Sequence, residues 1–164
     1  MTKFICSCVL LLAINTGAKA QLKVTDACPV FTVDVLEGSI NRIHPKSTSS
    51  EIIKTFPCQT NVEEQIDSAG RCQGVFYKNR GVSFFTGRNY IEVDNSFKGK
   101  MNPAIMGAAK GSLFATLGNP KMKDIEWEAY QTKYGTLIVY YNKANKINKI
   151  QMTTKSTDNI KLCE

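Results

Sequence analysis

The sequence predicts an α+β fold made of two tandem units, each a short helix followed by an antiparallel meander, with the helices packed on one face of a curved sheet. Three observations predict this fold. A capping box precedes a short apolar run, several runs rich in Val, Ile, Thr, Phe and Tyr end at turn residues, and the chain resembles itself at one constant offset.

The first helix is expected at about 49–56. Thr48-Ser-Ser-Glu51 is a capping-box sequence, in which the hydroxyl serves the open backbone N–H groups and the carboxylate reaches back to the cap. Its counterpart is expected at about 109–117, before the helix stop Gly118-Asn-Pro120. Each helix would open one unit of the fold.

Strands are expected after each helix because β-branched and aromatic runs there alternate with turn chemistry such as Lys78-Asn-Arg-Gly81. The expected strands lie at 74–78, 82–86 and 89–94 in the first unit, and at 124–131, 135–141 and 146–153 in the second.

An internal duplication supports this order. Three segments match at an offset of 61 residues, and they begin at Gly38 and Gly99, at Ile52 and Leu113, and at Gly74 and Gly135. We therefore expect a first unit at 21–97 and a second at 98–164, which together form one compact domain.

Alternation along a strand assigns side chains to faces. In the 124–131 strand it places Ile125, Trp127 and Ala129 under the helices, and Glu126, Glu128 and Tyr130 on the other face. In the 135–141 strand both alternating sets are apolar, so the pattern leaves the buried face open. A sheet face that carries large side chains would be a candidate contact surface, and coverage of both faces is the alternative.

The first 20 residues are typical of a cleaved secretory signal. Lys3 supplies the positive start, Phe4 to Ile14 form an apolar stretch, and Ala18-Lys-Ala20 is a small-x-small cleavage sequence. A cysteine does not follow the cleavage point, so a lipid anchor is not expected. Cleavage would lower the formal charge of +7 by two, and the remaining charges are interspersed, which argues against nucleic-acid binding.

Cleavage would leave four cysteines, Cys28, Cys58, Cys72 and Cys163. In an oxidising compartment an even number of cysteines indicates two disulfides, with three connectivities. We expect Cys58–Cys72 as a local link and Cys28–Cys163 between the two ends. A metal site is not expected, because the chain has no CxxC spacing and its only histidine is His44.

One stretch carries a resemblance. It contains Leu117-Gly-Asn-Pro120, Asp124 through Trp127 to Tyr130, Gly135 through Tyr141, and Lys146-Ile-Asn-Lys-Ile150. This pattern resembles the repeat of the β-lactamase-inhibitor-protein-like fold, which is similar to that of the small outer-membrane assembly lipoproteins. The resemblance is clear over 99–153 and weaker over 38–97. It implies tandem units joined into one concave sheet, which in the inhibitor grips a partner protein.

The sequence offers no recognisable catalytic set. His44 lies in a turn sequence, Ser83 and Ser112 lack a nucleophile elbow, and Glu126 with Glu128 is expected to be an exposed pair rather than a sugar-cleaving one. We therefore expect no enzyme and no cofactor.

The favoured function is a secreted or periplasmic protein-binding module of the inhibitor or immunity type, monomeric and not inserted in a membrane. The partner-binding residues are expected to be aromatic, aliphatic or Arg residues of the sheet and its turns, because these give large contact area and directional hydrogen bonds: Tyr77, Arg88, Tyr130, Ile138 and Tyr140. The alternatives are an envelope scaffold or assembly component and an unrecognised cell-wall or sugar hydrolase.

Overall fold

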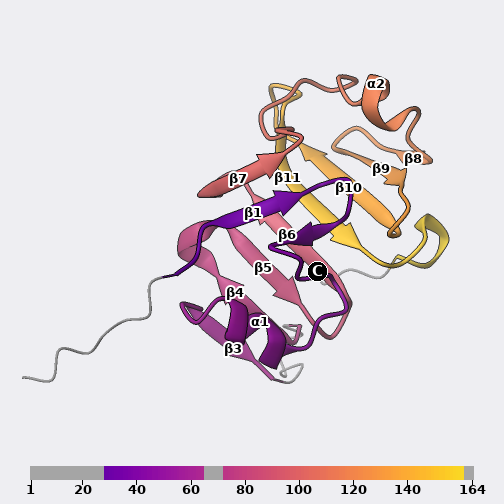
Figure 1. The fold of residues 1–164 in the computed structure, drawn as a ribbon. Helices are drawn as coiled ribbons and strands as arrows, with labels where there is room; N and C mark the ends of the chain where they lie inside the picture. The colour runs from indigo at the N-terminus through magenta and orange to yellow at the C-terminus, as the bar shows by residue number, and fades with distance from the viewer. Residues whose placement is uncertain (1–27, 65–71, 161–164) are drawn as a thin grey trace, which may run out of the picture.

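The computed structural model describes residues 28–64 and 72–160, so the expected signal segment and Cys163 lie outside the described residues. The described residues form two β-sheets (Figure 1). The small sheet has the order β2-β1-β7 and is built from β1 (Phe31–Asp34), β2 (Ser39–Ile40) and β7 (Gly99–Asn102). β1 pairs antiparallel with β2 and parallel with β7.

The large sheet is antiparallel and has the order β3-β4-β5-β6-β11-β10-β9-β8. Its strands are β3 (Asn61–Glu63), β4 (Gly74–Tyr77), β5 (Val82–Phe85), β6 (Tyr90–Asp94), β8 (Met122–Lys123), β9 (Trp127–Gln131), β10 (Thr136–Tyr141) and β11 (Ile147–Thr153). Helical segments are short: α1 (Ser49–Thr55), α2 (Phe114–Leu117) and the 3-10 turns η1 (Lys78–Arg80) and η2 (Thr157–Asn159).

The core lies between the two sheets. One face of the large sheet, the inner face, packs against the small sheet, α1 and the 105–113 segment (Figure 1). Phe31 of β1 stacks on Phe56 at 4.2 Å between ring centroids, and Tyr77 of β4 meets both rings edge-on. The large sheet is therefore covered on one side mainly by strands, and its other side is called the outer face below.

The expected fold class is wrong. The described residues are mostly β-structure in two sheets, with one α-helix of seven residues and one of four, so they do not form two helix-plus-meander units. If the chain were duplicated at an offset of 61 residues, strand β5 would correspond to residues 143–146. Those residues form the turn between β10 and β11, so the two halves do not have matching strands. The six expected strands themselves are present, within about three residues at each end.

The second expected helix fails because its backbone is used elsewhere. Gly107 donates to Ile147, Lys110 donates to Asn145, and Ile147 donates back to Ala108, so this segment bridges to the start of β11. Gly107 and Gly111 have φ of 77° and 85°, which a right-handed helix excludes. Tertiary hydrogen bonds thus hold the start of this segment at 107–110, and only Phe114–Leu117 of the expected range is helical.

The expected cysteine pairs are also wrong. Cys28 is bonded to Cys58, with Cα atoms 5.4 Å apart, and Cys72 is disulfide-bonded as well. Cys28 precedes β1 and Cys58 follows α1, and these two elements meet through the stacked Phe31 and Phe56. Packing therefore brings together two cysteines that are distant in sequence. In the described ranges no helix is long and apolar enough to cross a membrane.

Candidate functional site

The outer face is ordered by the strand register. One cross-strand row runs over β9, β10, β11 and β6 and contains, in that order, Trp127, Tyr140, Lys149 and Asp94. The next row extends across the sheet as far as β4 and contains Ala129, Ile138, Gln151, Glu92, Ser83 and Phe76. Since the side-chain period of a strand is two, both rows point away from the core.

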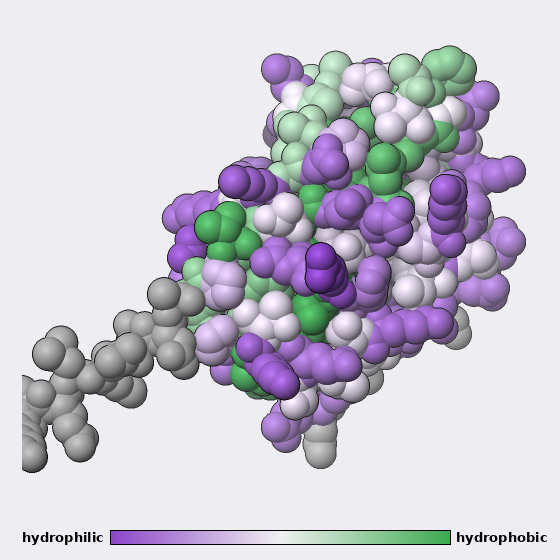
Figure 2. All heavy atoms as spheres, in the orientation of Figure 1, coloured by the Kyte–Doolittle hydropathy of each residue, from purple (hydrophilic) through white to green (hydrophobic). Residues whose placement is uncertain are grey.

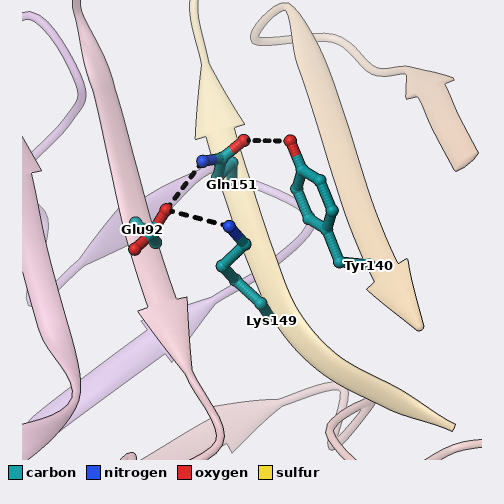
Figure 3. Close-up of polar contacts among 4 residues, drawn as sticks. All are labelled: Glu92, Tyr140, Lys149 and Gln151. Carbon is teal, nitrogen blue, oxygen red and sulfur yellow. Dashed lines mark hydrogen bonds and ion pairs between the residues drawn. The ribbon is translucent and has the colours of Figure 1, made fainter. Parts of the chain in front are cut away.

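Four of these residues form a polar array across three neighbouring strands (Figure 3). The Tyr140 hydroxyl donates to Gln151 Oε1 at 2.8 Å, and Gln151 Nε2 donates to Glu92 Oε2 at 2.7 Å. Lys149 Nζ lies 3.6 Å from the same Glu92 oxygen and 4.2 Å from the centroid of the Tyr140 ring. Each side chain is held by another, so the array is ordered before anything binds to it.

The electrostatics of the array keep Tyr140 neutral. Burial raises the pKa of the Tyr140 phenol, and the nearby charge of Glu92 raises it further. The side chains of Lys149 and Glu92 are 35% and 23% exposed, so solvent screens their ion pair and its contribution to stability is small. The ion pair therefore contributes mainly by placing two opposite charges beside a neutral phenol.

Aromatic rings flank the array on both sides. Trp127 is the cross-strand neighbour of Tyr140, and both are partly exposed. Toward the other edge, Phe85 packs against Phe76 at 5.4 Å and stacks on Tyr90 at 4.3 Å between ring centroids. Phe76 and Phe85 are also partly exposed. The outer face thus combines ordered polar groups with rigid aromatic rings.

One end of the outer face is covered by residues 154–160. Thr136 Oγ1 donates to the Lys155 carbonyl at 2.8 Å, and the Thr157 amide donates to Gln131 Oε1 at 3.4 Å. This segment explains why Thr136 is buried although it points outward. The row of Trp127 and Tyr140 is partly exposed, as are Phe76 and Phe85 toward the other edge.

The predicted binding residues do not come together. Tyr140 lies in the polar array, and Ile138 lies on the same face but is only 3% exposed. Tyr77 and Tyr130 are buried on the inner face, where Tyr77 donates to the Phe56 carbonyl and Tyr130 to Glu128. Arg88 lies in the turn between β5 and β6.

The predicted faces of β9 are reversed. Trp127 and Ala129 point to the outer face, whereas Glu128 and Tyr130 point into the core. The reason is that Glu128 is buried with two tyrosine hydroxyls as hydrogen-bond donors, which satisfies its carboxylate there. Glu126 is exposed, so the two carboxylates have different surroundings.

Three members of the array, Glu92, Lys149 and Gln151, were missed by the sequence analysis. A signal for one of them was present: in Ile91-Glu-Val-Asp94 apolar and acidic residues alternate strictly, which is typical of a strand with one open face. Their meeting depends on the pairing of β6 with β11, which no local pattern indicates.

The opposite side of the molecule has a different character. Figure 2 shows it as mostly hydrophilic, with apolar residues gathered toward the end that carries α2. Phe114 of α2 is 62% exposed. Over the described ranges no group of three or more His, Cys, Asp or Glu residues is arranged to hold a metal ion.

No family model, no curated protein and no solved structure matches this chain.

Proposed function

We propose that this protein is a non-catalytic binding module of the inhibitor or immunity type, and that the outer face of its large sheet holds a protein partner. The observation that carries the proposal is the polar array of Tyr140, Gln151, Glu92 and Lys149 beside the partly exposed Trp127. Tyr and Trp dominate binding energy at protein interfaces, and a side chain already held in place loses little entropy when a partner docks.

The charge of the chain favours an acidic partner. The formal net charge of the full chain is +7 and would be +5 after the expected cleavage removes Lys3 and Lys19, and a basic protein attracts acidic surfaces over a distance set by ionic strength. The proposed partner therefore brings an apolar patch to Trp127 and Tyr140 and carries acidic residues around that patch.

The proposed location is the periplasm or the extracellular space. The Cys28–Cys58 disulfide supports an oxidising compartment, and the signal-like sequence of residues 1–20 supports export.

A site-specific crosslink tests the proposal. A photoreactive amino acid at Gln131, which is exposed at the edge of the outer face, should capture one acidic protein from the surrounding compartment. The same group at Phe114, exposed on the α2 side, is the matched control and should capture little. Equal adducts from both positions, or adducts only with cell-wall glycan, would contradict the proposal.

The captured protein then allows an affinity measurement. Tyr140→Ala and Trp127→Ala should each weaken binding at least tenfold by calorimetry, because each removes about 2 kcal/mol of a central aromatic contact. Phe114→Ala should leave the affinity unchanged. Far-UV circular dichroism checks that each variant is folded, and an unchanged Kd for both aromatic variants would remove the outer face as the binding surface.

A further inference from the structure

A second site lies at the end of the large sheet, where the turn between β5 and β6 meets the segment after β11. An open pocket of about 500 Å³ occupies this place. It is lined by residues of both segments: Gly87, Arg88, Asn89, Thr154, Lys155, Ser156 and Asn159. The segment that supplies Lys155 is the one that crosses the end of the outer face, so the pocket borders the proposed binding surface.

The two walls of the pocket are fixed to each other and to the sheet. The Thr153 hydroxyl donates to the Asn89 carbonyl at 2.9 Å, which joins the two segments. The Arg88 amide donates to the Phe85 carbonyl at 3.1 Å and closes the turn. The Asn159 side chain donates to Ser156 Oγ at 3.2 Å. The pocket is therefore formed by an ordered backbone.

Among the described residues, Arg88 has no partner for its buried donor. Its Nε is shielded from solvent and makes no hydrogen bond, and no ion pair of Arg88 is found among the described residues. Thr154 Oγ1 is likewise buried without a hydrogen-bond partner. A buried donor on a charged guanidinium that stays unpaired is costly, so a native protein is expected to supply it with a partner such as a water, an ion or a ligand group.

The charge of the pocket is positive. Arg88 and the exposed Lys155 line it, and none of the described residues that line it is acidic. Asp158, the nearest acid along the segment, does not line it. The guanidinium is a planar fork whose N–H groups match the two oxygens of a carboxylate, and the hydroxyls of Thr154 and Ser156 add further donors.

We propose that this pocket binds a carboxylate, and that its physiological occupant is an Asp or Glu side chain of the acidic partner held on the outer face. The identity of the occupant rests on the proposed function. The affinity of the pocket for a carboxylate rests only on Arg88, Thr154, Lys155 and the geometry around them.

The test is an NMR titration of the Arg88 Nε–Hε resonance in the full chain. The probe is the capped tripeptide Ac-Ala-Glu-Ala-NH2, and Ac-Ala-Gln-Ala-NH2 is its neutral control. We expect a saturable shift of the Arg88 signal with the Glu peptide, with a Kd of about 1–10 mM for a single anchored side chain, and none with the Gln peptide. The Arg80 and Arg42 resonances should stay in place.

Two further probes separate the sources of the anion. Ac-Ala-Ala-OH offers only a main-chain carboxylate, and inorganic phosphate offers no carboxylate. Tighter binding of either probe than of the Glu peptide would overturn the assignment to an acidic side chain. A wild-type Arg88 signal that does not respond to any of the three anions would overturn the site itself.

Variants assign the roles. Arg88→Gln should abolish the saturable shifts of neighbouring amides, and Arg88→Lys should weaken binding at least tenfold because a point charge lacks the fork. Arg80→Gln, which removes an arginine outside the pocket, is the matched control and should bind as the wild type does. The titration needs no partner protein, so the two proposals can fail separately. If the crosslink captures no partner but the Arg88 signal responds to the Glu peptide, the proposed function is refuted and the carboxylate site is supported.

Discussion

The carboxylate of Glu128 is a charged acceptor inside the core. Its Oε2 accepts hydrogen bonds from the Tyr130 hydroxyl at 2.7 Å and the Tyr141 hydroxyl at 2.5 Å. Burial raises the pKa of both phenols, and the contact with Glu128 raises it further. Both tyrosines therefore stay protonated and donate, which satisfies a carboxylate that is only 7% exposed.

Removal of one of these donors should be more costly than removal of a neutral one. Tyr141→Phe should lower the free energy of unfolding by about 2 kcal/mol, because a hydrogen bond to a charged group is worth about 1.5–3 kcal/mol. Tyr77→Phe is the matched control. It loses a bond to the Phe56 carbonyl and should lower the free energy of unfolding by about 1 kcal/mol. Urea unfolding at pH 7 measures both losses. A loss for Tyr141→Phe that is equal to or smaller than the loss for Tyr77→Phe would contradict the role of Glu128 as a charged acceptor.

Helix α1 begins at a complete capping box, as the sequence predicts. The Glu51 amide donates to Thr48 Oγ1, and the Thr48 amide donates to Glu51 Oε2 at 2.8 Å. The bond from the Thr48 backbone lowers the pKa of the Glu51 carboxyl, and the bond from the Thr48 side chain lowers it further. The helix is short, so its first turn and the buried Ile52 hold it in place.

The capping box predicts that the effect of Thr48→Ala on stability depends on pH. Thr48→Ala should lower the free energy of unfolding by about 1 kcal/mol at pH 7, and Ser50→Ala, at an exposed position inside the helix, should change it little. Folding lowers the pKa of the Glu51 carboxyl. The contribution of Glu51 to the free energy of unfolding is therefore complete above the unfolded-state pKa of about 4.3, and it is lost as the pH falls through the folded-state pKa. The difference between Thr48→Ala and the wild type should therefore shrink at pH 2–3, and a constant difference would contradict the reciprocal cap.

A disulfide restrains the first described residues of the chain. The Cys28–Cys58 disulfide spans a sequence separation of 30 and links the residues before β1 to the segment that follows α1. Both cysteines pack against the core that joins the small sheet to the large one. The bond therefore restrains the segment that covers the inner face.

Loss of this disulfide should lower the stability of the whole fold. The double variant Cys28→Ser/Cys58→Ser should lower the free energy of unfolding by about 3–4 kcal/mol, the chain-entropy value for a loop of this length. Reduction of the wild type should cost more, because Cys72 is disulfide-bonded too. Denaturant curves measure the loss, and non-reducing peptide mapping should link Cys28 with Cys58. A loss below about 1 kcal/mol in the double variant would contradict this role.

Several features follow from the sequence alone because their causes are local. The capping box needs only Thr48 and Glu51, three residues apart. The six predicted strands need only β-branched and aromatic runs with turn residues between them. Tyr140 was placed in the candidate site from the sequence because it is a large aromatic residue on one of these strands.

The remaining features depend on contacts between distant residues. β1 pairs with β7 in a register that joins Phe31 to Gly99, and β6 pairs with β11 in one that brings Glu92 beside Gln151. Strand β10 carries large side chains on both faces, so only its neighbours decide that Tyr141 is inside and Tyr140 outside. The sequence by itself determined where the first helix and six of the strands of the large sheet form. The tertiary structure alone decided which faces are buried, which cysteines bond and which side chains meet, because these depend on pairing between segments that no local pattern links.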